Sequence, residues 1–323
     1  MSFALSWELT NACHLRCKTC LPASGRPRPG ELSTAQTLGV LRELARAGAD
    51  RVLFTGGEPL FRPDFADVLT AAAEIGMVTE AITSGTLASR RALAAIKDAN
   101  TRLSVSFDGA RPETHDLVRG DGMFARAVAG CRRFAAEGIP FDLSVTISRV
   151  NVRELADVAR LGRDLSCRRV FFSEVSRAGR AADNWALLAL TPSQRHGLPE
   201  AVAEVAASVF GDDGLLADDS CWVTGKSLYL DACGRAYLCA EIAQRDSGRH
   251  VADLTKPDGT RRALMALRGE WHGHRLCLYE SFASAHVSLI AVHDRPCAVL
   301  ALAEPVAAVS RSSGTRAGRE VSR

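Results

Sequence analysis

The sequence predicts an α/β fold, a partial (β/α)6 barrel of the TIM type with a small cysteine-rich α+β extension after it. The first two thirds of the 323 residues alternate between short apolar runs of strand length and longer amphipathic runs of helical spacing. This alternation indicates a parallel sheet with right-handed crossovers. Six such units make three quarters of an eight-stranded barrel, whose functional residues lie at the carboxyl ends of the strands.

The strand-length runs are apolar stretches bounded by turn residues, which is typical of buried strands. We expect strands at Ala4–Leu9, Arg51–Phe54, Val78–Thr83, Leu103–Phe107, Phe141–Ile147 and Val170–Ser173.

The longer runs between them are rich in Ala, Leu and Arg at helical spacing. Ser33 and Ser89 are suitable N-cap residues, and Gly48, Gly76 and Gly138 follow the last helical positions, as helix boundaries commonly require. We expect helices at Thr34–Ala47, Asp64–Ile75, Ser89–Asp98, Phe124–Glu137 and Val152–Leu165.

The pattern changes from about Pro192. A helical run, Ser193–Phe210, precedes a cysteine-bearing region with a hairpin expected at Ser227–Leu230 and Arg235–Leu238. The sequence therefore divides into a barrel over residues 1–205, a second unit over 206–305 and a basic tail over 306–323. The tail is rich in Ser, Arg and Gly, a composition that favours disorder.

The charge of the chain argues against a polyanionic partner. The formal net charge is +3, and the segment Ser310–Arg323 holds four arginines against Glu320, so it carries the whole excess. The body is then close to neutral, whereas a nucleic-acid interface needs basic clusters on the folded domain. The composition, 47% hydrophobic and 24% charged, is that of an ordinary globular protein.

No targeting or membrane segment is evident. The N-terminus lacks a basic leader followed by an apolar run, and the apolar stretch from Val287 to Val292 ends at His-Asp-Arg-Pro. That stretch falls well short of the about 20 residues needed to span a bilayer. We expect a cytoplasmic protein without membrane contact, whose ten cysteines stay reduced and available for metal or redox chemistry.

Three cysteines follow the first expected strand. Residues 13–20 read Cys-His-Leu-Arg-Cys-Lys-Thr-Cys, which places Cys13, Cys17 and Cys20 on one loop. Thiolates at such short spacing hold iron–sulfur clusters, and three ligands for four irons leave one iron open to a substrate. The alternative, a structural zinc site, normally recruits a fourth Cys or His, and His14 inside the loop is poorly placed to serve.

This segment resembles the signature of the radical S-adenosylmethionine (SAM) superfamily, and further motifs resemble that family in the same order. One motif follows each of the next five strands: Thr55-Gly-Gly-Glu-Pro59, Thr83-Ser-Gly85, Ser106-Phe-Asp-Gly109 with His115-Asp-Leu-Val-Arg-Gly120, the pair Thr146 and Asn151, and Arg177-Ala-Gly-Arg180. The residue before the last cysteine is usually aromatic in the family and packs near the adenine, but here it is Thr19.

The resemblance implies a 4Fe-4S cluster on Cys13, Cys17 and Cys20 that binds S-adenosyl-L-methionine, and a set of residues around this cofactor. Gly56 and Gly57 would let backbone carbonyls approach its amino group, Glu58 would accept a hydrogen bond there, and His115 and Arg119 would face the substrate or a lid. The cofactor-binding residues are then Gly56, Gly57, Glu58, Pro59, Ser84, Ser106, Asp108, Thr146, Ser148 and Gly179.

The resemblance also implies the reaction. A reduced cluster, supplied by an electron donor such as flavodoxin or ferredoxin, cleaves the sulfonium, and the 5′-deoxyadenosyl radical removes a hydrogen atom from the substrate. The protein's part is orientation and a dry cavity. The subclass, whether oxidoreductase, epimerase or lyase, stays open at this stage.

The later cysteines resemble the start of a Twitch/SPASM extension, which carries auxiliary iron–sulfur clusters. The dense cysteine block of a full SPASM domain is absent from the sequence, so one auxiliary 4Fe-4S cluster is expected, with Cys233 and Glu280 as alternative ligands. Its expected ligands are Cys221, Cys239, Cys277 and Cys297. Buried free thiols are the alternative, and Cys131 and Cys167 are interpreted as structural.

If Cys297 completes that cluster, Cys233 is left at the hairpin tip, where it is a candidate hydrogen donor to a substrate radical. Many peptide-modifying relatives carry a recognition domain before the barrel, and this chain starts a few residues before its first expected strand. A short chain with one auxiliary cluster resembles the Twitch enzymes that dehydrogenate, epimerise or decarboxylate small polar natural products. This resemblance implies a substrate of the aminoglycoside, cyclitol or nucleoside-sugar type. The alternatives are maturation of a ribosomally made peptide, and an iron–sulfur electron-transfer protein without catalysis.

Overall fold

The computed structural model describes residues 2–205, 227–245, 247–268 and 300–301. Six strands and the helices between them alternate in the first 174 residues. The strands are β1 (Phe3–Thr10), β2 (Ala49–Gly56), β3 (Val78–Thr83), β4 (Arg102–Ser106), β5 (Phe141–Ile147) and β6 (Val170–Glu174). The intervening helices are α1 (Thr34–Arg46), the 3-10 turn η1 (Pro59–Phe61), α2 (Phe65–Glu74), α3 (Arg90–Asp98), α4 (Pro112–Arg119), α5 (Met123–Ala136) and α6 (Leu155–Asp164).

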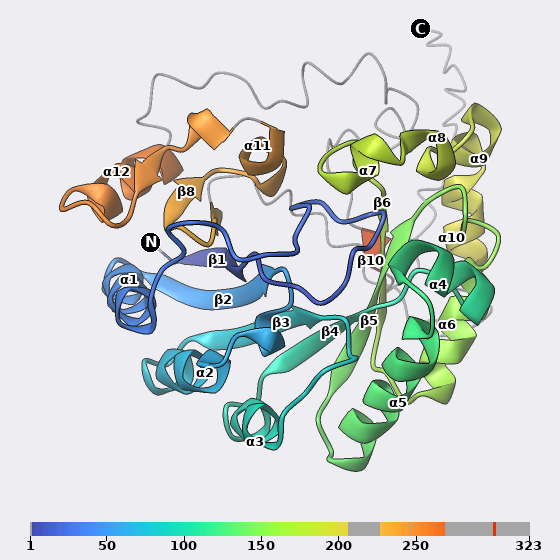
Figure 1. The fold of residues 1–323 in the computed structure, drawn as a ribbon, viewed down its shortest axis with the longest axis horizontal. Helices are drawn as coiled ribbons and strands as arrows, with labels where there is room; N and C mark the ends of the chain where they lie inside the picture. Colours follow the sequence, from blue (N-terminus) through green and yellow to red (C-terminus); the bar gives the residue numbers. More distant parts are fainter. Residues whose placement is uncertain (1, 206–226, 246, 269–299, 302–323) are drawn as a thin grey trace, which may run out of the picture.

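These six strands are neighbours in one curved sheet in the order β6-β5-β4-β3-β2-β1. Four strands from the C-terminal part of the chain, described below, extend this sheet at its two edges. Strands β1 to β6 are all parallel to their neighbours and follow one another in chain order. The helices cover the convex face, as Figure 1 shows. The expected partial (β/α)6 barrel is therefore confirmed, with its carboxyl strand ends at one edge.

The hydrophobic core lies between the sheet and these helices. Leu5 and Trp7 of β1 are buried together with Leu41 and Leu44 of α1, and alternate residues of β1 and β4 are only half-buried. This alternation follows from the period of two along a strand. The half-buried positions on the concave face include polar residues such as Ser6 and Ser106.

The helix boundaries follow the capping signals. Ser33 forms a capping box with Gln36, and Ser89 caps α3 through the backbone N–H of Ala92. Gly138 after α5 has φ of 70°, a left-handed conformation that glycine adopts without steric cost.

Two parts differ from the sequence-based expectation. Helix α4 was expected only as a motif, because its short polar sequence lacks an apolar stripe; Pro112 at its first turn starts it. The expected helix Ser193–Phe210 begins as two helices, α9 (Pro192–His196) and α10 (Leu198–Val205), with Gly197 as the C-cap residue of the first. Two further short helices, α7 (Arg180–Asp183) and α8 (Trp185–Leu188), precede them.

The described part of the C-terminal unit is joined to the barrel sheet. Strand β7 (Ser227–Leu230) pairs in parallel with β1 and forms a hairpin with β8 (Arg235–Tyr237), as expected from the sequence. The remaining elements are α11 (Ala240–Arg245), η4 (Ser247–Arg249), β9 (Ala252–Asp253), α12 (Gly259–Leu267) and β10 (Leu300–Ala301). The domain boundaries at residues 205 and 305 stay predictions.

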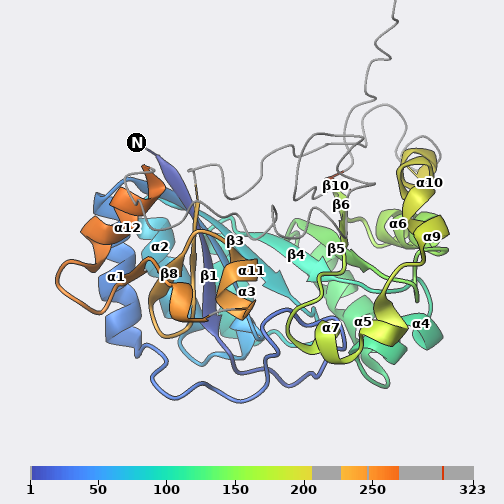
Figure 2. The same ribbon diagram turned by 90° about the horizontal axis from the view of Figure 1, so that it is seen from above.

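Figure 2 shows the same chain from above, with β8 and α12 towards one end of the molecule and α9 and α10 towards the other. Among the helices that the structure describes, none combines the length and the apolar character needed to cross a bilayer.

Candidate functional site

The segment between β1 and α1, residues 11–33, crosses the carboxyl edge of the sheet between the β7–β8 hairpin and α7 (Figure 1). We call it the cysteine loop. The backbone N–H of Lys18 donates to the carbonyl of Val118 at 2.8 Å, and that of Arg180 donates to the carbonyl of Cys20 at 3.0 Å. Helix α4 and the start of α7 thus hold the loop from two sides.

Cys13, Cys17 and Cys20 are reduced and half-buried on this loop. The pKa of the Cys13 thiol is raised to about 11, chiefly by burial and to a smaller extent by Glu58, Cys17 and Cys20, while the hydrogen bond from the Leu15 N–H opposes the rise. Burial likewise raises the pKa of Cys17, while Arg119 lowers it. Three close thiols in this environment need a cation to become thiolates, which an iron cluster supplies.

The arrangement fits a cluster better than a single ion. Within the described ranges, no group of three or more His, Cys, Asp or Glu side chains is gathered around a point where one metal ion could bind. In a cluster each thiolate can bind a different iron, so the sulfurs need not converge on one point. His14 donates to or accepts from Thr86 Oγ1 at 2.7 Å through Nε2, so that nitrogen is engaged away from the thiols.

The Gly-Gly-Glu-Pro segment follows β2 and packs against the start of the cysteine loop. The backbone N–H groups of Gly57 and Glu58 donate to the carbonyls of Thr10 at 2.7 Å and Ala12 at 2.9 Å. A Cβ atom on Gly57 would lie 2.1 Å from the Ala12 carbonyl oxygen. Glycine is therefore required here by the close approach of two backbones, and Pro59 then starts η1.

Glu58 is buried beneath this segment, with 1% of its surface exposed. One carboxylate oxygen accepts from Thr83 Oγ1 at 2.8 Å, and the other accepts from the N–H and hydroxyl of Ser84 at 2.8 and 2.6 Å. Burial raises its pKa, and these bonds oppose the rise. Glu58 and Ser84 thus connect the ends of β2 and β3 to each other, while their contact with the cofactor stays a prediction.

Asp108, His115 and Arg119 form a buried group at the ends of β4 and α4. Arg119 pairs with Asp108 at 2.9 Å between Nε and Oδ2. Burial lowers the pKa of His115 to about 3, so its neutral ring accepts from the backbone N–H of Asp108 and packs against Phe107 and Phe124. His115 is buried and 10% of the Arg119 side chain is exposed, so the expectation that they face a substrate or lid stays a prediction.

The remaining expected cofactor residues lie at the predicted strand ends, with different exposure. Ser106 and Thr146 are half-buried on the concave face, and Ser148 is fully buried in a turn closed by Asn151. A Cβ atom on Gly179 would lie 2.0 Å from the Leu21 carbonyl oxygen. Gly179 is thus required by the cysteine loop, and its predicted contact with adenine stays untested.

Sequence reasoning missed two arginines that anchor the cysteine loop. Arg180 donates to the carbonyls of Cys17 at 2.9 Å and Ser24 at 2.7 Å. Arg28 pairs with Glu8 at 3.2 Å. The only signal in the sequence is that Arg180 belongs to a strand-end motif. The partners of the two arginines could not be predicted, because each lies far from its arginine in the sequence.

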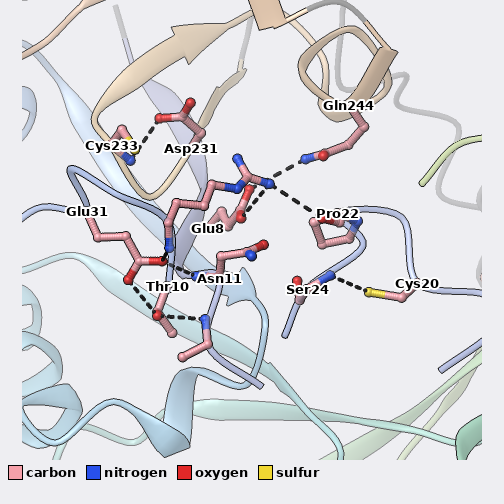
Figure 3. Close-up of polar contacts among 12 residues, drawn as sticks. Glu8, Thr10, Asn11, Cys20, Pro22, Ser24, Glu31, Asp231, Cys233 and Gln244 are labelled. Atoms are coloured by element: carbon pink, nitrogen blue, oxygen red, sulfur yellow. Dashed lines mark hydrogen bonds and ion pairs between the residues drawn. The ribbon is translucent and has the colours of Figure 1, made fainter. Parts of the chain in front are cut away.

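Glu8 of β1 joins the cysteine loop to the C-terminal hairpin and to α11, whose Gln244 lies beside Glu8 in Figure 3. Its side chain is fully buried, pairs with Arg28, and accepts a hydrogen bond from Tyr229 Oη at 2.9 Å. Burial raises the pKa of Glu8 to about 7, more than Arg28 lowers it.

We therefore expect Glu8 to make stability depend on pH. The folded carboxyl holds its proton up to about pH 7, whereas the unfolded carboxyl loses it near pH 4.5. The free energy of unfolding should then fall by about 3 kcal/mol as pH rises through this window and level off above it. Urea unfolding of the wild type and Glu8→Gln at several pH values gives the free energy of unfolding of each protein as a function of pH. If this free energy changed with pH by the same amount in both proteins, the prediction would be wrong.

The second cysteine set is described only in part. Cys239 follows β8, and Cys233 lies at the hairpin tip with its thiol directed at the Pro29 carbonyl at 3.7 Å. Figure 3 shows Cys233 and Cys20 on opposite sides of Glu8. The hydrogen-donor role of Cys233 stays a prediction. The expected ligands Cys221, Cys277 and Cys297, and the alternative Glu280, lie outside the described residues.

Comparison with known proteins agrees with this geometry. The family model described as the radical SAM superfamily matches residues 7–162. Mycofactocin maturase MftC from Mycobacterium ulcerans (strain Agy99) is 31% identical over 293 residues, which cover 90% of this chain and 69% of that protein. The chain belongs to the radical SAM superfamily. It is an enzyme of this family, which implies a 4Fe-4S cluster and S-adenosyl-L-methionine.

Other radical SAM proteins match over shorter segments. AdoMet-dependent heme synthase from Methanosarcina barkeri (strain Fusaro / DSM 804) is 35% identical over 184 residues, 55% of this chain and 53% of that protein. PqqA peptide cyclase from Rhodopseudomonas palustris (strain ATCC BAA-98 / CGA009) is 35% identical over 219 residues, 67% of this chain and 57% of that protein. The chain thus spans little more than half the length of these two relatives.

Among solved structures, SuiB from Streptococcus suis, bound to precursor peptide SuiA, matches with a TM-score of 0.71 at 13% identity. The match covers 89% of this chain and 70% of that chain, and it shows a shared fold. The expectation of a small-molecule substrate is wrong, because the curated relatives include a peptide cyclase and a maturase.

Proposed function

We propose that this radical SAM enzyme modifies a ribosomally made precursor peptide, using a SAM-binding 4Fe-4S cluster on Cys13, Cys17 and Cys20. The observation that carries the proposal is the set of three reduced thiols on one loop at the carboxyl edge of six parallel strands. In a barrel of this type that edge is where catalysis takes place.

The bound cofactors would supply an electron and a 5′-deoxyadenosyl radical, and the chain's own residues would position them. Gly56 lies against the end of β1 and Gly57 against the start of the cysteine loop. The N–H groups of Gly57 and Glu58 donate to Thr10 of β1 and Ala12 of the loop, so backbone of the Gly-Gly-Glu-Pro segment lies beside the cysteine loop. Glu58 fixes this segment to β3 through Ser84. Ser106 and Thr146 line the concave face, where a substrate would meet the cofactor.

The peptide class of substrate is supported by the relatives. The maturase MftC matches over 90% of this chain, so the likeness extends beyond the barrel into the C-terminal part. The PqqA peptide cyclase matches over 67% of it. A peptide also suits a concave face that carries hydroxyl groups at several strand ends, because hydroxyls both donate to and accept from peptide groups.

We further propose that residues 206–305 form a Twitch/SPASM-like unit with one auxiliary cluster on Cys221, Cys239, Cys277 and Cys297. The pairing of β7 with β1 supports this, since it attaches the segment before Cys239 directly to the barrel. Iron and sulfide analysis of wild type and Cys239→Ala tests the proposal. We expect the wild type to hold about eight irons, as two four-iron clusters require, and the variant about four. Equal iron contents would contradict it.

The function is tested by the fate of a substrate hydrogen atom. Anaerobic protein, reductant and SAM are incubated with the short peptide encoded beside the gene, prepared in fully deuterated form. We expect deuterium in the 5′-deoxyadenosine and a changed peptide mass, because the radical removes hydrogen directly from the substrate.

A scrambled peptide of the same composition is the control and should yield only slow, undeuterated 5′-deoxyadenosine. If SAM is cleaved but no deuterium leaves the encoded peptide, the peptide assignment fails and the enzyme assignment stands.

A further inference from the structure

A buried cation lies beside the cysteine loop and has no part in the proposed function as stated above. Arg119 is the last residue of α4, and 10% of its side chain is exposed. Burying a guanidinium is costly unless it is paired. Its Nε lies 2.9 Å from Oδ2 of Asp108, whose side chain is fully buried.

The carboxylate of Asp108 is held by two further donors. The backbone N–H of Thr146 donates to Oδ1 at 3.0 Å, and the hydroxyl of Thr19 donates to Oδ2 at 3.2 Å. Thr19 lies between Cys17 and Cys20. Asp108 is therefore fixed by β5 on one side and by the cysteine loop on the other, and it fixes Arg119 in turn.

The guanidinium has a second contact that the ion pair does not require. Its Nη1 lies 3.9 Å from the sulfur of Cys17. The sulfurs of Cys13 and Cys20 accept instead from the backbone N–H groups of Leu15 and Ser24, at 3.3 and 3.4 Å. Cys17 thus receives a charged donor where its two neighbours receive neutral ones.

The guanidinium is placed to serve both contacts at once. Its Nη1 approaches the sulfur of Cys17, while its Nε lies beside the carboxylate of Asp108.

We propose that Arg119, held by Asp108 and Thr19, is a positioning residue that donates to the Cys17 sulfur of the bound cluster and raises its reduction potential. This inference rests on the ligand set proposed above. Reduction adds one negative charge to the cluster, and a fixed cation beside a ligating sulfur stabilises the more negative state. Hydrogen bonds to the sulfurs and nearby charge are the means by which proteins set such potentials.

A purely structural role is the simpler explanation, since the same ion pair ties α4 to β4. The two roles differ in what they change. Loss of an anchor lowers stability and leaves the potential of an intact cluster alone, whereas loss of a cation at the sulfur changes the potential and the spectrum.

The experiment measures the midpoint potential of the cluster by redox titration with electron paramagnetic resonance, after anaerobic reconstitution. The variants are Arg119→Lys and the double variant Arg119→Gln with Asp108→Asn, which removes both charges together and avoids a buried unpaired one. Arg62→Lys is the matched control, because Arg62 is equally buried and pairs with Asp64 at 2.6 Å, but its contacts are to Asp64, Thr37 and backbone carbonyls.

In the double variant we expect the reduction equilibrium to shift at least tenfold towards the oxidised cluster, which is 59 mV for one electron, with altered g values. Arg119→Lys keeps the charge but lacks the planar guanidinium that reaches both Cys17 and Asp108, and it should shift the equilibrium in the same direction by less. Arg62→Lys should leave the potential unchanged. Unchanged potentials in Arg119 variants with full iron content would overturn the inference while leaving the proposed function intact.

A wild type that assembles no cluster would defeat the proposed function itself. If both Arg119 variants fail to take up iron while Arg62→Lys does, the pair is a structural anchor, and the redox assignment is overturned.

Discussion

Replacing Cys17 by Ala is expected to abolish assembly of the SAM-binding cluster, lower the iron content from about eight to about four, and reduce SAM cleavage to the rate of a protein-free control. Cys17 is the middle cysteine of the loop; the Arg119 guanidinium approaches its sulfur, and the Arg180 guanidinium donates to its carbonyl. Two thiolates leave two irons without protein ligands, which removes the site rather than weakening it. Iron and sulfide content and 5′-deoxyadenosine yield measure the effect.

The matched control is Cys167→Ala. Cys167 is half-buried after α6, and its thiol donates to the Arg169 carbonyl at 3.5 Å. This change should cost about 1 kcal/mol of stability and leave iron content and SAM cleavage unchanged. If the Cys17→Ala protein kept the full iron content of the wild type, Cys17 would not be a ligand of the SAM-binding cluster.

Replacing Gly57 by Ala should have the second largest effect. The new Cβ would lie 2.1 Å from the carbonyl oxygen of Ala12, a backbone atom that cannot rotate away. The cysteine loop must move, and we expect overpacking to cost about 1–3 kcal/mol of stability. A displacement of about 1 Å at a reacting centre can cost about 10²-fold in rate, so we expect SAM cleavage to fall by that factor.

Gly39→Ala provides the control for this change. Gly39 lies inside α1, and a Cβ there would meet no atom within 4 Å. The substitution should keep the rate and raise stability by up to about 1 kcal/mol, because alanine is the better helix former. Equal rates for Gly57→Ala and the wild type would show that the packing of the Gly-Gly-Glu-Pro segment on the loop does not set the site.

The sequence predicts where Glu58 lies but not which groups its carboxylate contacts. Its place after β2 was evident from the sequence, and the structure confirms that position. That its carboxylate accepts from Thr83 and Ser84 was not evident, because those residues lie 25 and 26 positions away. A strand-end motif predicts which residues gather at the edge of the sheet, but the direction of each side chain depends on the packing around it.

The sequence by itself determined the order and location of the six strands, the site edge and the three cysteines. The physical reason is that alternating hydrophobic periods specify strands and helices locally, and parallel strands joined by helices must bring their carboxyl ends together. The same logic located the loop glycines at strand ends.

Only the tertiary structure decided which polar residues face the concave surface and which are enclosed. Asp108 pairs with a cysteine-loop residue 89 positions away, and Arg180 with one 156 positions away. Such contacts arise from the winding of the whole sheet, and no local periodicity encodes them. Burial makes these contacts specific, because a charge removed from water must be paired with a particular partner. The pairs then hold the residues of the site in place.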